Sequence, residues 1–199
     1  MSVRTAADAK PATSVGEAAK AAAPAPRPPD RATVERFSTL MLPHLDAAYN
    51  FARYLTRGSD HAEDVVHDAY ARALSAFSSY RGGDAKSWLL TIVRNCFLSS
   101  VRRRPEISAT TEMADVADLA DTPEAALARN QTAQIMRRLI KALPDNLAEI
   151  IVLREVEDLS YKEIAVIIDA PIGTVMSRLA RAREALAKAW RAETGEGAP

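Results

Sequence analysis

The segment from Leu159 to Leu186 constrains the fold of this chain most, because it has the pattern of two short helices around a tight turn. Ser160 is placed to cap the first helix, and the side chain of Glu163, three residues later, can reach back to the cap. Asp169 tolerates the left-handed conformation of a tight turn, and Pro171 suits the first position of a new helix. The segment is therefore predicted to form a helix-turn-helix.

The second helix of this pair is predicted to have one apolar and one polar face. On a helical wheel with about 100° per residue, one narrow arc contains Val175, Leu179, Ala182 and Leu186. Another arc collects Thr174, Ser177, Arg178 and Arg181. The apolar arc is expected to pack on the preceding helix, where the small Ala165 permits a close crossing, so that hydroxyl and guanidinium groups face outward. Such groups bind phosphate oxygens and guanine edges in a major groove, although a basic face on an ordinary helical hairpin would look the same.

Bulk properties exclude several classes of protein. The 199 residues suffice for one ordinary domain or two small ones, and no apolar run approaches the roughly 20 residues that cross a bilayer. The first residues lack a secretory signal, so a cytoplasmic location is expected. Cys96 is a single cysteine and is expected in the core, and the three histidines lack metal-binding spacing. With no paired nucleophile and base and no phosphate loop, we expect neither an enzyme nor a cofactor.

The formal net charge of zero hides a segregation of charge along the chain. The stretch from Pro105 to Ala128 carries acidic residues and neither Lys nor Arg. Local patches rather than the total charge set the affinity for phosphate, so a nucleic-acid partner is not excluded.

The N-terminal part of the chain changes character at Glu35. Residues 1–34 are rich in Ala and Pro and are predicted to be a disordered tail. Beyond them, apolar residues recur every three or four positions, which predicts a long amphipathic helix with a bend near Pro43. Its apolar positions are Phe37, Leu40, Met41, Leu45, Ala48, Tyr49, Ala52 and Leu55.

Two further helices are predicted to complete an N-terminal core. Asp60 and Glu63 form a capping-box pattern ahead of an apolar stripe, Val65, Val66, Ala69, Ala73 and Phe77. A loop at 80–84 precedes a helix from Ala85 to Arg103 that Pro105 ends. This helix is expected to point Trp88, Leu89, Ile92, Val93 and Phe97 inward.

The predicted fold is all-α, with two small helical domains joined by a flexible acidic linker. Ala126–Leu143 and Leu147–Val156 are expected to be helices on either side of Pro144, and no strand alternation is visible. The expected divisions are a tail at 1–34, a domain at 35–104, the linker at 105–128, the helix-turn-helix domain at 129–191 and a tail at 192–199.

Two blocks of the sequence resemble one family. PIGTVMSRLARAREAL, from Pro171, is similar to the region-four helix-turn-helix of bacterial RNA polymerase sigma factors of the two-domain, extracytoplasmic-function type. AEDVVHDAYARAL, from Ala62, resembles the polymerase-binding helix of the same family, and SWLLTIVRN, from Ser87, resembles the helix that ends its region two. Together the resemblances span most of the range from Glu35 to Arg191. Three positions depart from it: Ser99 stands where Asp is common, Asp169 where Gly is common, and Met176 where Lys or Arg is frequent.

The resemblance implies a transcription initiation factor that binds core RNA polymerase, promoter DNA and an anti-sigma protein. It implies a polymerase-binding face formed by Asp64, His67, Asp68 and Arg72. It implies contacts to the melted minus-ten element from Tyr80, Arg81, Lys86, Arg94, Asn95, Arg102 and Arg103. Arg104 is expected to bind phosphate beside Arg102 and Arg103. Contacts to the minus-thirty-five element would come from Thr174, Ser177, Arg178 and Arg181. In this family the linker threads toward the active-site and RNA-exit channels of the polymerase. For the acidic linker of this chain two roles stay open, mimicry of nucleic acid in those channels and that of an ordinary disordered spacer.

Two other functions remain open from the residues alone. A stand-alone helix-turn-helix regulator with a helical sensing domain would share the DNA-binding unit, but it would bind duplex DNA without polymerase. A helical adaptor with incidental basic patches would bind neither DNA nor polymerase.

Overall fold

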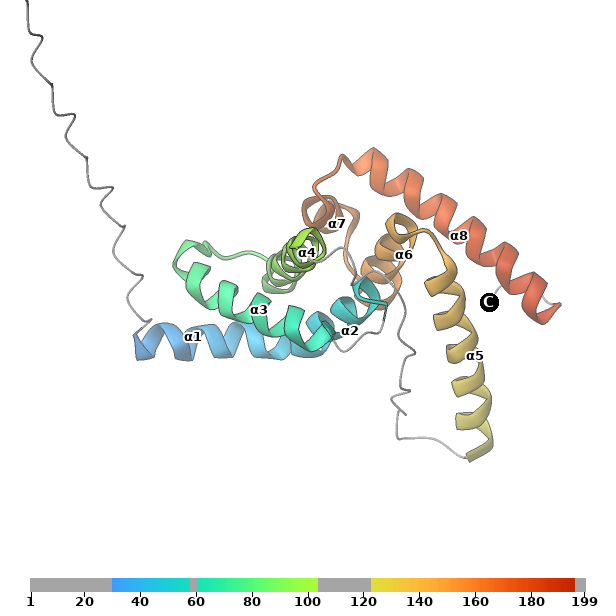
Figure 1. Ribbon diagram of the computed structural model, residues 1–199, viewed down its shortest axis with the longest axis horizontal. Coiled ribbons are helices and arrows are strands. Elements are labelled where there is room, and N and C mark those ends of the chain that lie inside the picture. Colours follow the sequence, from blue (N-terminus) through green and yellow to red (C-terminus); the bar gives the residue numbers. More distant parts are fainter. Residues whose placement is uncertain (1–29, 58–60, 104–122, 196–199) are drawn as a thin grey trace, which may run out of the picture.

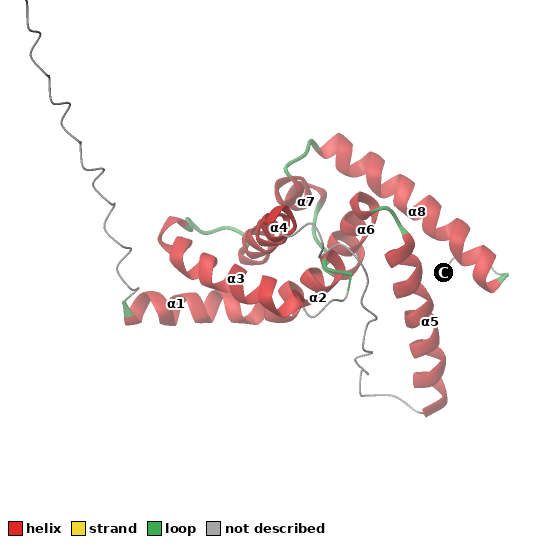
Figure 2. Cartoon of the chain, in the orientation of Figure 1, coloured by secondary structure: helices red, strands yellow, loops and turns green. Residues whose placement is uncertain are grey.

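The computed structural model describes residues 30–57, 61–103 and 123–195. Within these ranges the chain is built from helices joined by short loops, and no strand occurs (Figure 2). The all-α prediction is confirmed for this part of the chain.

The N-terminal domain consists of helices α1 to α4 (Figure 1). They are α1 (Arg31–Met41), the 3₁₀ turn η1 (Leu42–His44), α2 (Leu45–Leu55), α3 (His61–Ala76), the 3₁₀ turn η2 (Phe77–Ser79) and α4 (Ala85–Arg103). Helix α4 packs against α1, α2 and α3, and its Leu89, Leu90 and Val93 are fully buried in the resulting core. The bounds of α4 agree with those predicted.

The predicted bend at Pro43 is confirmed, because the chain passes from α1 to α2 through η1. In the 3₁₀ turn the backbone N–H of Leu45 donates to the carbonyl oxygen of Leu42, three residues earlier, so the Met41 carbonyl, four residues earlier, needs another donor. The hydroxyl of Tyr70 on α3 donates a hydrogen bond of 2.9 Å to the carbonyl oxygen of Met41.

Two predictions for this region are wrong. Helix α1 begins at Arg31, because the carboxylate of Asp30 caps it by accepting from the backbone N–H of Thr33 at 2.7 Å, so the predicted tail was too long. Leu45 is 43% exposed, whereas Phe51 is fully buried. The bend rotates α2 relative to α1, so one apolar arc does not continue through both helices.

The stripe predicted for α3 is confirmed, since Val65, Val66, Ala69, Ala73 and Phe77 are buried. Asp60, the predicted cap of α3, lies outside the described residues. On α4, Cys96 is buried as expected, but Trp88, Ile92 and Phe97 are only partly buried.

The C-terminal domain consists of α5 (Pro123–Ala142), α6 (Asp145–Ile151), the π-helical turn η4 (Val152–Val156), α7 (Tyr161–Ile168) and α8 (Ile172–Thr194). Helix α5 begins inside the segment predicted to be linker, because Pro123 suits the first turn of a helix. The rest of the linker, with Arg104, lies outside the described residues. Helix α6 and η4 together replace the single predicted helix at 147–156.

The predicted helix-turn-helix is confirmed by its backbone geometry. The backbone N–H of Ser160 donates to the Glu163 carboxylate at 2.7 Å, and the N–H of Glu163 donates to the Ser160 hydroxyl at 3.3 Å. Asp169 has a φ of 51°, the left-handed conformation expected of the turn. Pro171 is the N-cap of α8 rather than its first residue, because its extended backbone (ψ 146°) places the first helical turn at Ile172.

The two domains pack against each other. Helix α7 lies against α4, and α6 lies against α2, in the middle of the molecule (Figure 1). Helices α5 and α8 contact each other on the side away from α3. Helix α4, which carries most of the predicted minus-ten contacts, is therefore part of the interface between the domains.

Candidate nucleic-acid interface

The loop between η2 and α4, which carries Tyr80 and Arg81, is held by an aromatic cluster. The ring of Tyr80 stacks on Phe77 with centroids 5.8 Å apart, and it lies 5.1 Å from the ring of Trp88. The Tyr80 hydroxyl donates to the carbonyl oxygen of Gly83 at 2.7 Å. Gly83 has a φ of 99°, a conformation that favours glycine. Since Tyr80 and Trp88 are partly exposed, the loop presents an ordered aromatic surface.

Lys86 and Arg94 on α4, both predicted to contact DNA, instead contact the C-terminal domain. The Lys86 Nζ atom lies 2.8 Å from the carboxylate of Glu157 and 2.7 Å from its carbonyl oxygen. The Arg94 Nε atom lies 2.6 Å from the carboxylate of Glu149 on α6. Ion pairs link the predicted minus-ten face of α4 to the other domain.

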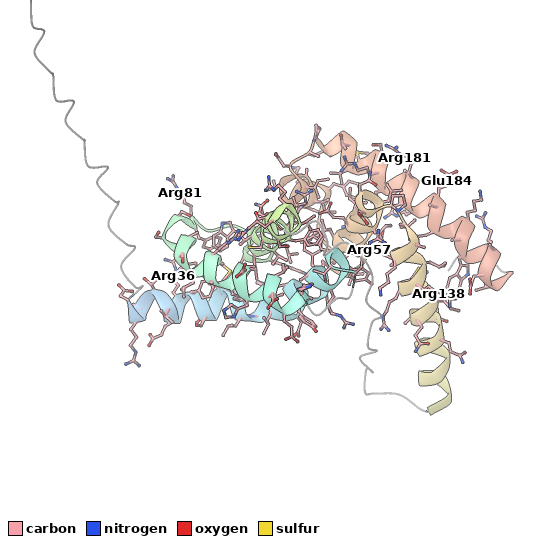
Figure 3. The ribbon with its side chains drawn as sticks, in the orientation of Figure 1. Arg36, Arg57, Arg81, Arg138, Arg181 and Glu184 are labelled. Atoms are coloured by element: carbon pink, nitrogen blue, oxygen red, sulfur yellow. The ribbon has the colours of Figure 1, made fainter. Side chains whose placement is uncertain are left out.

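The other predicted minus-ten residues of the described chain are exposed. Arg81 projects from the loop at one end of the molecule (Figure 3). Asn95 is exposed in the middle of α4. Arg102 and Arg103 are exposed in the last turn of α4, where their Nε atoms donate to the carbonyl oxygens of Leu98 and Ser99. Cations at this helix end are favoured by the helix dipole as well as by any phosphate partner.

The four residues of the polar arc of α8 differ in exposure. Ser177 and Arg181 are exposed, and Figure 3 shows Arg181 on the outer side of α8. Thr174 and Arg178 are partly covered, and Arg178 lines a cavity between the two domains. The opposite, apolar arc is buried at Val175, Leu179 and Ala182, as predicted, while Leu186 is partly buried.

The interdomain cavity has a volume of about 450 Å³ and is bounded by α2, α4, α5, α6 and α8. Arg94 and Arg178 line it together with Lys141. Burial lowers the pKa of Lys141, and the nearby charges of Arg53 and Arg57 lower it further. At its edge, Arg57 of the N-terminal domain forms an ion pair with Asp145 of the C-terminal domain. The cavity is therefore rich in basic groups.

The predicted polymerase-binding face of α3 is fully accessible. Its four residues, Asp64, His67, Asp68 and Arg72, are all exposed, while the apolar stripe of the same helix is buried. Nothing in the C-terminal domain covers them among the described residues. The face is thus available for a protein partner.

Sequence reasoning missed Glu149 and Glu157, which bind the basic groups of α4. Glu157 could have been noticed, because it lies in the apolar surroundings of Leu153 and Leu159, where a carboxylate needs a partner. Its partner, 71 residues earlier in the chain, has no local signal. Among the described residues, no group of His, Cys, Asp and Glu side chains could hold a metal ion, and no helix is both long and apolar enough to cross a membrane.

The chain matches two family descriptions and several characterised proteins. "Sigma-70 region 2" matches residues 40–106, and "Sigma-70, region 4" matches residues 133–186. The sigma-H factor of Pseudomonas aeruginosa is 32% identical over 165 residues, covering 77% of this chain and 85% of that protein. The ECF RNA polymerase sigma-E factor of Escherichia coli K12 is 38% identical over 146 residues, covering 68% of this chain and 75% of that protein.

Solved structures agree with these sequence matches. The sigma factor RpoE of Bartonella quintana, solved in complex with the anti-sigma factor NepR, has a TM-score of 0.65 and 28% identity, covering 79% of this chain and 98% of that chain. CnrH, solved with the cytosolic domain of CnrY, has the same fold, with a TM-score of 0.56 and 22% identity, covering 81% of this chain and 91% of that chain. The chain therefore belongs to the extracytoplasmic-function RNA polymerase sigma factors of the sigma-70 family.

Proposed function

We propose that this sigma factor directs RNA polymerase to promoters by using its two domains on different parts of the assembly. The N-terminal domain binds core RNA polymerase through the exposed face of α3 and helps to open the minus-ten element through the loop at 80–84 and α4. The C-terminal domain reads the minus-thirty-five element through the polar arc of α8.

The observation that carries this proposal is the presence of both sigma regions, in order, in one chain. A stand-alone regulator accounts for the helix-turn-helix, but not for a region-two domain with an exposed charged face on α3. An adaptor accounts for neither. The function that we propose is therefore that of a transcription initiation factor rather than a free-standing repressor or activator.

The chemistry of the two DNA-contacting surfaces supports this division. Tyr80 and Trp88 offer aromatic rings beside the loop, and stacking on such rings holds bases that have left a duplex. The arc of α8 offers hydroxyl and guanidinium groups at a helix that can enter a major groove. The first surface suits melted DNA and the second suits intact duplex.

An anti-sigma protein is the expected regulator. The B. quintana relative was solved in complex with the anti-sigma factor NepR, and this chain covers 98% of that relative. A protein of this class that binds both domains would control access to polymerase and promoter.

Co-purification with core RNA polymerase tests the proposal. An affinity-tagged full-length chain, mixed with purified bacterial core enzyme, is expected to form a stable complex that survives gel filtration. The complex should initiate transcription in vitro at a promoter that core enzyme alone does not use. Failure of the chain to associate with core enzyme would refute the proposed function, and dimeric binding of the chain alone to duplex DNA would favour the regulator.

A further inference from the structure

The interdomain cavity has an excess of positive charge that its own carboxylates do not neutralise. Its lining contains four basic side chains, Arg57, Arg94, Lys141 and Arg178, and two carboxylates, Asp145 and Glu149. Arg57 pairs with Asp145, and Arg94 pairs with Glu149. The two remaining positive charges therefore lie on Lys141 of α5 and Arg178 of α8.

Lys141 and Arg178 lack an acceptor in the part of the chain that the structure describes. Neither forms a hydrogen bond or an ion pair with a described residue, although both residues are partly buried. Burial lowers the pKa of Lys141, and so do the charges of Arg53 and Arg57. An anion beside Lys141 would offset both effects, because it favours the charged ammonium group. The cavity thus offers two cations that a ligand can neutralise.

The rest of the cavity wall is mostly apolar. It includes Leu55 of α2, Phe97, Leu98 and Val101 of α4, and Ile140 of α5. Cavities of about 300–1,000 Å³ with apolar walls and a few placed charges are typical of small-molecule sites, and this cavity measures about 450 Å³. The convex surface of a DNA duplex does not fit a concave space of this size. The combination of an apolar wall and two unpaired cations therefore suits a small anion with an apolar body.

We propose that the cavity binds a small organic phosphate, whose phosphate group contacts Lys141 and Arg178 and whose apolar or aromatic body packs on Phe97 and Leu98. A phosphate monoester carries roughly −1.5 to −2 charges at neutral pH, which matches the two positive charges in excess. Ammonium and guanidinium groups bind phosphate oxygens through charge-assisted hydrogen bonds. This site goes beyond the proposed function, because neither polymerase nor promoter takes part in it.

Such a ligand contacts both domains at once. Phe97 and Leu98 belong to the N-terminal domain, whereas Lys141 and Arg178 belong to the C-terminal domain. A ligand that binds the folded chain but not the unfolded chain stabilises the folded chain increasingly as its concentration rises. We therefore expect 1-naphthyl phosphate, an aromatic phosphate monoester, to raise the Tm of the full-length chain progressively. A constant Tm up to saturating ligand would overturn the proposal.

Isothermal titration calorimetry of the wild-type chain with three probes tests the chemistry of the site. The probes are 1-naphthyl phosphate, inorganic phosphate and 1-naphthol, so the charged group and the apolar body are also tested separately. We expect 1-naphthyl phosphate to bind at least about tenfold more tightly than either of the others, because it alone uses both parts of the cavity. Absence of binding, or equal affinity for inorganic phosphate or for 1-naphthol, would overturn the proposal.

Matched substitutions locate the site. K141M removes the charge but keeps the length of the side chain, and it is expected to weaken the binding of 1-naphthyl phosphate by about tenfold, because a charge-assisted hydrogen bond is lost. K162M is its control, since Lys162 is exposed on α7 and does not line the cavity. L98Q should also weaken binding by making the wall polar, whereas L42Q changes another exposed leucine, at the bend between α1 and α2. Equal affinities in each variant and its control would place the ligand outside the cavity and overturn the proposal.

Protection of lysines from acetylation tests the site in the unaltered chain. Wild-type chain is treated with an N-hydroxysuccinimide ester of acetic acid, with and without 1-naphthyl phosphate, and the acetylated lysines are quantified by mass spectrometry. The ligand is expected to slow the acetylation of Lys141 several-fold, while the exposed Lys162 and Lys188 react as before. Unchanged acetylation of Lys141 at saturating ligand would overturn the proposal even if the variants do not fold.

Discussion

The carboxylate of Asp84 accepts a hydrogen bond of 2.5 Å from the backbone N–H of Ser87. It therefore satisfies a free donor at the beginning of α4, the helix that carries most of the predicted minus-ten contacts. Burial of Asp84 acts to raise the pKa of its carboxyl, but hydrogen bonding to Ser87 and the charges of His44 and Lys86 together outweigh burial and lower the pKa.

Loss of this cap should destabilise the N-terminal domain. Asp84→Ala is expected to lower the free energy of unfolding by about 1 kcal/mol, whereas Asp84→Asn keeps a capping oxygen and should lie near the wild type at neutral pH. Because the pKa of Asp84 is lower in the folded state, its contribution is present above the unfolded pKa of about 3.9 and is lost as the pH falls through the folded pKa. Urea denaturation between pH 2 and 7 measures this, and equal pH profiles for wild type and Asp84→Asn would contradict it.

Tyr70 should support the bend between α1 and α2. Tyr70→Phe removes the only side-chain hydroxyl that the described chain offers to the Met41 carbonyl and is expected to cost about 1 kcal/mol. Burial, and secondarily Asp46, raises the pKa of Tyr70 to about 12. Because the pKa of Tyr70 is higher in the folded than in the unfolded state, the neutral hydroxyl adds to the free energy of unfolding. This contribution is complete below the unfolded pKa of about 10 and is lost as the pH rises toward 12. Unfolding measured over that range should be less steeply pH-dependent in Tyr70→Phe, and an identical slope would exclude this role.

The two arginines of the polar arc should affect promoter binding differently. Arg178→Ala should relax the preference for bases at one or two positions of the minus-thirty-five element, by about 1–3 kcal/mol, because a bidentate contact to guanine carries that discrimination. Arg181→Ala should weaken binding to all sequences alike and reduce its salt dependence, as expected for a phosphate contact. Holoenzyme binding to single-base promoter variants at two salt concentrations distinguishes the two roles. An unchanged base preference in Arg178→Ala would remove Arg178 as a base reader.

Charge reversal on α3 should weaken the binding of core polymerase. Asp64→Lys combined with Asp68→Lys alters the exposed face but leaves the buried stripe intact, so helix content should not change. Glu63→Lys is the control, because Glu63 is exposed on the same helix but lies outside the predicted face. Fluorescence anisotropy with labelled chain measures the affinity, and equal values for all variants would rule out this face as the docking surface.

The elements that the sequence predicted well depend on local interactions. The capping pair Ser160 and Glu163, the left-handed Asp169 and the bend at Pro43 each follow from residues within a turn of one another. The erroneous burial of Leu45 shows where this fails, because the direction of α2 depends on how far the chain turns at the bend. A local pattern of apolar residues predicts which face of one helix is buried. It does not predict which face of the next helix is buried when a bend separates the two.

The candidate site was predicted only in part, for a related reason. The family resemblance implied DNA contacts from Lys86 and Arg94, and the polar arc of its helix predicted them for Arg178, but the surroundings of all three depend on the packing of two domains separated by a linker. The apolar surroundings of Glu157 indicated that it needs a partner, but the partners of Glu149 and Glu157 could not be identified until that packing was known. Side chains whose surroundings come from a single helix, such as those of the α3 face, were placed correctly.

Promoter binding measured with and without core RNA polymerase tests the central claim most directly. A duplex promoter fragment is titrated with the full-length chain alone, with core enzyme alone and with both. The account predicts specific binding, and subsequent opening of the minus-ten element, only when chain and core enzyme are present together. Tight, sequence-specific binding of duplex DNA by the chain alone, unchanged by core enzyme, would contradict it.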